Sequence, residues 1–142
     1  KPYLNLASGT PSNAEYMDRT NWSGTLGEGV ENVIGNIFDG NTGSDIAANS
    51  APWEFTLDLG AETTMLGANT RHWGSGYAPR SIEVLTSPDN ATWKSHGTLA
   101  VSDGTQNWRF LKPVTARYLR YRVMSPNGRT DVTEFNIYVA KQ

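Results

Sequence analysis

Apolar and polar residues alternate along several short segments of the chain, and this period of two predicts β-strands with one buried face. The clearest segment covers residues 53–59, where Trp53, Phe55, Leu57 and Leu59 share one face. The other predicted strands cover residues 65–72, 81–86, 92–96, 107–111, 117–124 and 132–139. The predicted core includes the strand tryptophans Trp53, Trp93 and Trp108.

Turn residues separate these strands. Pro88, Asp89 and Asn90 form the clearest turn, because proline presets φ and the Asp and Asn side chains bond their own backbone. Leu, Lys and Glu, which favour helices, are sparse, whereas Thr, Asn, Ser, Gly and Trp are abundant. About seven or eight short strands with a turn roughly every 8–12 residues are typical of an antiparallel sandwich or barrel. The pattern therefore predicts an all-β fold.

Residues 5–50 show little periodicity and are rich in Gly, Asn and Ser. One helical turn is expected at residues 30–37. Tyr16 and Phe38 indicate that this long irregular segment packs against the fold, whereas the position of Trp22 is left open by the pattern.

Composition restricts the function classes. The 142 residues suit one domain over residues 1–142, and 11% aromatic residues can build its core. The formal net charge of −2 offers no large basic field for nucleic acid or an anionic membrane. No apolar run approaches the roughly 20 residues that span a bilayer. The absence of cysteine excludes disulfides, thiolate metal sites and a cysteine nucleophile, and we expect Lys1 to be a mature or excised N-terminus.

The sequence does not contain a recognisable catalytic constellation. His72 and His96 are the two histidines available for a triad or a zinc site, and no nucleophile-elbow motif surrounds any serine. Asp45, Asp103 and Asp131 lie in predicted loops without the paired pattern that a glycosidase needs. We therefore expect a protein that is not an enzyme.

Six segments occur in an order that resembles one known family. They lie at residues 5–7, 38–44 (Phe-Asp-Gly-Asn-Thr-Gly-Ser), 55–60 (Phe-Thr-Leu-Asp-Leu-Gly), 82–93, 116–121 (Ala-Arg-Tyr-Leu-Arg-Tyr) and 134–138 (Glu-Phe-Asn-Ile-Tyr). Together they resemble the discoidin family, also called coagulation factor V/VIII C-type domains, and its bacterial branch of family 32 carbohydrate-binding modules. The resemblance covers nearly the whole chain. It implies an eight-stranded antiparallel jelly-roll-like β-sandwich with no catalytic role, attached to a secreted enzyme or displayed on a bacterial surface.

The oxygen-rich loop at residues 38–45 is a candidate calcium site. Calcium prefers six to eight hard oxygen ligands, and Asp39 and Ser44 supply a carboxylate and a hydroxyl. An aspartate that only caps a turn is the structural alternative. The family resemblance implies a structural Ca²⁺ ion with these ligands: Asn36 and Asn41 through carbonyl oxygens, Asp39, Ser44 and Glu134.

The segment at residues 71–80 combines aromatic rings with planar polar groups, as a site for neutral sugars requires. A second polar loop, residues 125–131, precedes the last strand, and the implied fold gathers such loops at one end. An indole that plugs the end of the sandwich is the alternative for Trp73. The predicted sugar-binding residues are Arg71, His72, Trp73, Tyr77, Arg80, Asn127 and Arg129.

The chain departs from the family pattern at two places. Asp45 and Ile46 stand where the family often has Trp-His, and no aromatic residue follows Pro126 in the last loop. A galactose-type or related terminal sugar is the ligand that the resemblance implies, with His72 as the candidate to replace the missing histidine.

Two function classes stay open. The first is a carbohydrate-binding module that targets an attached secreted enzyme or surface protein to a glycan. The second is an interaction or spacer domain of a secreted or surface bacterial protein that binds no sugar. Eukaryotic relatives bind proteins or phospholipid headgroups, but the polar loops of this chain argue against membrane binding.

Overall fold

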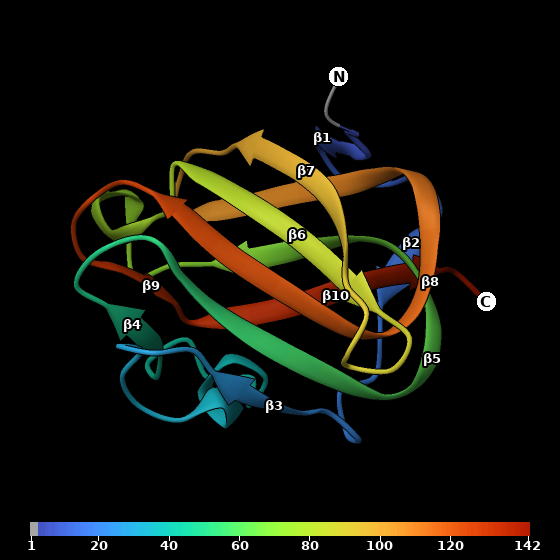
Figure 1. Ribbon diagram of the computed structural model, residues 1–142, viewed down its shortest axis with the longest axis horizontal. Helices are drawn as coiled ribbons and strands as arrows, with labels where there is room; N and C mark the ends of the chain where they lie inside the picture. The colour runs from blue at the N-terminus through green and yellow to red at the C-terminus, as the bar shows by residue number, and fades with distance from the viewer. Residues whose placement is uncertain (1–2) are drawn as a thin grey trace.

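The computed structural model describes residues 3–142 (Figure 1). Its strands are β1 (Leu6–Ser8), β2 (Ala14–Tyr16), β3 (Ser23–Leu26), β4 (Ile46–Ala48), β5 (Trp53–Arg71), β6 (Ser81–Ser87), β7 (Lys94–Ala100), β8 (Thr105–Ser125), β9 (Thr130–Val132) and β10 (Glu134–Ala140). Its 3₁₀-helices are η1 (Ile34–Ile37) and η2 (Ser75–Tyr77). Residues 3–142 contain no α-helix, and neither helical turn has the length and apolarity that a membrane crossing requires.

Strands β5 and β8 each pass through both layers of an antiparallel β-sandwich. Residues 53–58 of β5 pair with 118–123 of β8, and residues 63–71 pair with 105–116. One layer therefore runs β7-β6-β8-β5-β3, and the other runs β1-β8-β5-β10-β2. Both long strands bend between the layers in Figure 1, and Gly60 supports the bend of β5 with a φ of +86°. Strands β4 and β9 form a separate two-stranded sheet at one end.

The core joins the two layers through large aromatic side chains. Phe55 and Tyr121 belong to one layer and Phe135 to the other, and all three are fully buried. Their ring centroids lie 5.3–5.4 Å apart, with Phe135 edge-on to both partners. The alternation predicted for residues 53–59 is confirmed, since its four apolar side chains are at most 3% exposed.

The all-β antiparallel sandwich is confirmed, but the strand boundaries differ from the predicted ones. The segments at 53–59 and 65–72 are one strand, and so are those at 107–111 and 117–124. The turn residues between them bend the strand while pairing resumes on the far side. The last predicted strand is divided into β9 and β10.

The prediction that Trp93 lies in the core is wrong. Strand β7 begins after it, at Lys94, so that Trp93 belongs to the turn and is only half-buried. The guanidinium of Arg120 lies 4.0 Å from the centre of its ring. Trp22, in contrast, is 6% exposed and packs edge-on against Phe38, which confirms that the irregular N-terminal segment covers the core.

Candidate functional site

The two loops that carry the predicted sugar-binding residues meet at one end of the sandwich. The first loop follows β5, and the second joins β8 to β9. The Trp73 N–H donates to Asp131 Oδ1 at 3.0 Å, and the Arg80 N–H donates to the Ser125 carbonyl at 2.8 Å. We call the exposed side chains of these loops the rim surface: Arg71, Trp73, Tyr77, Arg80 and Asn127.

His72 lies beneath the rim surface rather than on it. Its side chain is 0% exposed. Nδ1 donates to the Asp131 carbonyl, and Nε2 accepts from the Thr70 hydroxyl at 3.2 Å. Burial lowers the pKa of His72 to about 4, so the ring is neutral at pH 7. This placement differs from the predicted direct contact with a sugar, because both ring nitrogens of His72 already have hydrogen-bond partners within the protein.

The indole of Trp73 is 65% exposed and therefore does not plug the end of the sandwich. It borders an open hollow of about 330 Å³. The other residues along this hollow come from the oxygen-rich loop, the end of β5 and the residue after it, the start of β8 and the residue before it, and the residue between β9 and β10: Thr42, Arg71, His72, Gly104, Thr105 and Thr133. A flat ring beside a polar hollow matches the combination of groups that sugar recognition requires.

Arg71 and Arg80 are both exposed, and Arg71 lines the hollow beside Trp73. Neither forms an ion pair with any residue between 3 and 142. Arg80 uses one N–H to hold the Ser75 carbonyl at 2.9 Å, which ties its side chain to η2. Most guanidinium donors of these two residues are therefore free for bidentate bonds to a ligand.

Arg129 uses its donors within the protein. Its two terminal nitrogens reach the Glu31 carboxylate at 2.9 and 3.1 Å, and Nη1 also reaches Asn49 Oδ1 at 2.8 Å. Arg129 thus connects the last loop to the N-terminal segment, and its exposed neighbour Asn127 remains on the rim surface. Glu31 and Asn49 were not predicted as partners, because their contact with Arg129 spans 98 and 80 residues of sequence.

Asp131 is the residue of this site that the sequence interpretation left without a role. It is 4% exposed and accepts the Trp73 N–H, while its carbonyl accepts from His72. Burial raises the pKa of Asp131 to about 6. An aspartate at the end of a polar loop reads as exposed in the sequence, so hydrophobic periodicity could not reveal its burial.

Acidification from pH 7 to pH 4.5 is expected to lower the free energy of unfolding by about 2 kcal/mol. Burial lowers the pKa of His72 and of His96 to about 4. The unfolded chain therefore binds protons between pH 6.5 and pH 4 that the folded chain does not, so stability is lost across that window. Asp131 acts in the opposite direction, because its raised pKa lets the folded chain bind a proton first. The two histidines together change the free energy of unfolding by more than Asp131 does, so the net effect of acidification is a loss of stability.

Urea denaturation followed by tryptophan fluorescence at both pH values, in the presence of EDTA, measures this effect. His96→Gln should flatten the dependence on pH. Asp131→Asn keeps an acceptor for the Trp73 backbone N–H but removes the carboxyl group whose protonation stabilises the folded chain at low pH. This variant should therefore show a steeper dependence of stability on pH. Equal stability of the unmodified protein at the two pH values would contradict the assignment of neutral, buried histidines.

The oxygen-rich loop forms a compact turn around Asp39. One carboxylate oxygen of Asp39 accepts the Asn41 N–H at 2.8 Å, and the other accepts the Ser44 hydroxyl at 2.7 Å. The Ser44 hydroxyl also lies 3.2 Å from the Asn41 carbonyl. Three of the predicted calcium ligands are thus neighbours in space, and all offer hard oxygen atoms.

Glu134, at the start of β10, closes this group from the far end of the sequence. Its carboxylate accepts from the Gly40 N–H at 3.1 Å and from Arg19 Nη1 at 2.8 Å. Burial raises the pKa of Glu134, and a hydrogen bond to the carboxyl group of Asp39 raises it further, whereas Arg19 lowers it. Glu134 thus contacts the oxygen-rich loop at Gly40, the residue after Asp39, so that a cation at this loop could be held by carboxylates from both segments.

The donor set favours calcium over a transition metal. Among residues 3–142, no three His, Cys, Asp or Glu side chains gather into a metal-binding group. A cation at this loop would therefore depend on hydroxyl and carbonyl oxygens in addition to the two carboxylates. Such ligands suit Ca²⁺ and not Zn²⁺, which binds through nitrogen and sulfur in most protein sites.

Comparison with known proteins agrees with this architecture. The profile of the F5/8 type C domain matches residues 16–136. None of the curated protein sequences is significantly similar to the chain. The family 32 carbohydrate-binding module of NanJ from Clostridium perfringens, solved in complex with galactose, has a TM-score of 0.77 at 13% identity. The similarity covers 89% of this chain and 99% of that one.

Two further solved structures are similar. The C-terminal domain of a chitobiase from Bacteroides fragilis has a TM-score of 0.74 at 18% identity, covering 87% of this chain and 96% of that domain. The first two family 32 modules of ZmpB from Clostridium perfringens, in complex with GalNAc, give a TM-score of 0.73 at 15% identity. That similarity covers 87% of this chain but 35% of the other, so modules of this fold occur side by side in longer chains.

Proposed function

The chain belongs to the F5/8 type C domain family, whose domains are non-catalytic binding modules, and on that premise we propose that it binds a terminal sugar of a glycan on the rim surface. The observation that carries this proposal is the position of Trp73. Trp73 is 65% exposed, its backbone N–H donates to buried Asp131, and the exposed residues Arg71 and Arg80 precede and follow it in the chain with most of their donors free. An exposed aromatic plane near bidentate donors can stack on a sugar ring and bond its adjacent hydroxyls.

The fold relatives support the class of ligand. The NanJ module was solved with galactose, and the ZmpB modules were solved with GalNAc. For this chain we propose a galactose-type or related terminal sugar. Because the ring of His72 is enclosed, Arg71, Trp73, Tyr77, Arg80 and Asn127 are the side chains that would contact it.

A structural Ca²⁺ ion is part of the proposal. The residues that would hold it are Asn36 and Asn41 through their carbonyl oxygens, and Asp39, Ser44 and Glu134 through their side chains. The hydrogen bond from the Gly40 N–H to the Glu134 carboxylate, which brings Glu134 to the loop of Asp39, supports it. The ion would join the loop at residues 38–45 to β10 and add its binding energy to the stability of the fold.

The proposed role of the module is to target an attached protein to a glycan. Binding to one sugar is weak, and covalent attachment to an enzyme or to further modules converts weak affinity into avidity. We propose that the chain acts outside the cell or at the cell surface, within a larger multidomain protein.

Truncation of Trp73 to alanine is expected to weaken glycan binding by about tenfold or more, because the stacking plane is removed while the backbone anchor remains. A glycan array identifies the best-bound sugar, and calorimetric titration with that sugar compares the two proteins. Tyr16→Ala, which removes another exposed aromatic ring, from β2, should leave the affinity unchanged.

If no glycan binds, or if Trp73→Ala binds as tightly as the unmodified protein, the sugar-binding proposal is wrong. The remaining function would then be an interaction or spacer domain. The internal use of His72 and Arg129, two of the seven predicted sugar-binding residues, is the observation that favours this alternative.

A further inference from the structure

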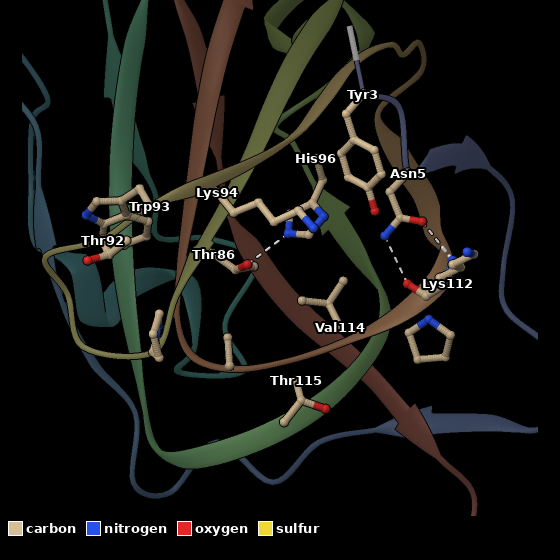
Figure 2. Close-up of a pocket in the computed structure, with 13 residues that line it drawn as sticks. Tyr3, Asn5, Thr86, Thr92, Trp93, Lys94, His96, Lys112, Val114 and Thr115 are labelled. Atoms are coloured by element: carbon tan, nitrogen blue, oxygen red, sulfur yellow. Dashed lines mark hydrogen bonds between the residues drawn. The ribbon is translucent and has the colours of Figure 1, made fainter.

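A second pocket lies far from the rim surface, beside the turn that joins β6 to β7 (Figure 2). Its volume of about 460 Å³ is within the range of small-ligand sites, roughly 300–1,000 Å³. Strand β6 begins beside the rim loop at Ser81 and ends at this pocket, so its seven residues separate the two places by roughly 20 Å. We call it the lysine pocket. Its walls are Tyr3, Asn5, Thr86, Pro88, Thr92, Trp93, Lys94, His96, Lys112, Pro113, Val114, Thr115 and Ala116.

The lysine pocket carries positive charge on a protein whose net charge is −2. Lys94 and Lys112 line it, and no Asp or Glu does. Within the described part of the chain, neither lysine takes part in an ion pair. Two unneutralised ammonium groups beside one hollow favour an anionic ligand.

His96 leaves a buried polar atom without a partner in this pocket. The residue is 2% exposed, and Nε2 bonds the Thr86 hydroxyl at 2.8 Å. No group of residues 3–142 bonds Nδ1. Figure 2 shows the ring between Thr86 and Tyr3. A buried polar atom without a partner costs free energy, and a ligand hydroxyl or carboxylate could satisfy it.

Aromatic and apolar groups supply the other half of the pocket. The ammonium of Lys94 lies 4.6 Å from the centre of the Tyr3 ring, and that ring lies 6.1 Å from the His96 ring. Trp93, Pro88 and Pro113 add flat apolar faces. Such faces pack against the C–H face of a sugar ring, while the lysines and His96 suit its charged and hydroxyl groups.

The N-terminal segment holds this arrangement in place. The Asn5 side chain donates to the Lys112 carbonyl at 2.9 Å and accepts its N–H at 2.7 Å, and the Asn5 N–H donates to the His96 carbonyl at 2.8 Å. Gly97, with a φ of +102°, permits the N-terminal segment to pass close to β7, because a Cβ at residue 97 would lie 2.8 Å from the Tyr3 carbonyl oxygen. The pocket is therefore formed before a ligand arrives.

We propose that the lysine pocket is a second binding site, which takes an anionic saccharide, a sugar ring that bears a carboxylate or a sulfate group. The ring packs against Tyr3 and Trp93, the anion lies at Lys94 and Lys112, and one oxygen bonds His96 Nδ1. This site is independent of the rim surface and stands whether or not the rim binds a sugar.

Titration of ¹⁵N-labelled protein with sodium glucuronate tests the proposal, with glucose as the neutral counterpart. Glucuronate should shift the signals of Lys94, His96 and Lys112, including the His96 ring, and glucose should bind at least fivefold more weakly. N-acetylglucosamine 6-sulfate distinguishes sulfate from carboxylate as the preferred anion. The affinity should fall as salt rises from 50 to 500 mM, because the attraction is electrostatic.

Variants locate the site. Lys94→Gln and Lys112→Gln, both at exposed positions, should each weaken glucuronate binding at least fivefold, whereas Lys141→Gln should not change it. The proposal is overturned if no acidic sugar binds, if the shifts appear only around Trp73, or if both lysine variants bind normally. Binding of inorganic sulfate as tight as that of the sugars would show an adventitious ion only and overturn it as well.

Discussion

Removal of calcium with EDTA is expected to lower the melting temperature of the protein by about 10 °C or more. A ligand that binds only the folded state at a thousandfold excess over its Kd stabilises by about 4 kcal/mol. For a domain of this size, each kcal/mol corresponds to roughly 3–4 °C. Without the ion, the Asp39 carboxylate has no ion-pair partner among residues 3–142, and Glu134 pairs with Arg19 at 2.8 Å. Differential scanning calorimetry in 1 mM calcium and in EDTA measures the shift.

Asp39→Ala should remove this sensitivity to EDTA, because it deletes a central ligand of the proposed ion. Asp89→Ala is the matched control. Asp89 also accepts backbone N–H groups of its own turn, from Ala91 and Thr92, but it belongs to the turn between β6 and β7. The Asp89 variant should lose some stability and keep its response to EDTA. A melting temperature that does not change with EDTA, or an Asp39 variant that still responds, would refute the calcium site.

Truncation of Phe135 to alanine is expected to cost about 4 kcal/mol of unfolding free energy, measured by urea denaturation in EDTA. The Phe135 ring is fully buried and lies edge-on to Phe55 at 5.4 Å and to Tyr121 at 5.3 Å. Those partners belong to the opposite layer, so the truncation leaves a cavity in the contact between the layers. The surrounding strands are paired on both sides and cannot collapse to fill it.

Phe135→Leu should cost less, about 1–2 kcal/mol, because it keeps most of the buried apolar volume. Leu111→Ala removes a side chain that is 51% exposed and should cost less than about 1 kcal/mol. A Phe135→Ala variant that loses no more stability than Leu111→Ala would mean that the two layers do not depend on this aromatic contact.

Much of the fold could be predicted because burial imposes a period of two on a half-buried strand. Trp53, Phe55, Leu57 and Leu59 follow that period, and all four are buried. The period does not distinguish a bend from a break. The strand predicted over residues 53–59 therefore ended before Gly60, whereas β5 continues past Gly60 into the other layer. Trp93 was assigned to the core for a related reason. The local sequence around a tryptophan next to a turn is the same whether its ring packs into the core or, as here, against Arg120.

The site was predictable in its residue types and not in its contacts. The sequence placed a Trp, a Tyr and two Arg side chains in the segment at residues 71–80, and all four are exposed in the structure. It did not show that His72 is enclosed or that Arg129 pairs with Glu31. Both facts depend on partners 59 and 98 residues away along the chain.

The amino-acid sequence alone determined the β-class of this protein, its family and the loops that carry its polar and aromatic groups, because these follow from local period and from the order of short segments. Tertiary structure alone decided which of those groups face solvent. Exposure and charge depend on which distant segments pack together. Asp131, for example, packs against the backbone of Trp73, and Glu134 lies near Asp39. The lysine pocket is a consequence of the same kind, since it exists only where the N-terminal segment crosses β7 and the bend of β8.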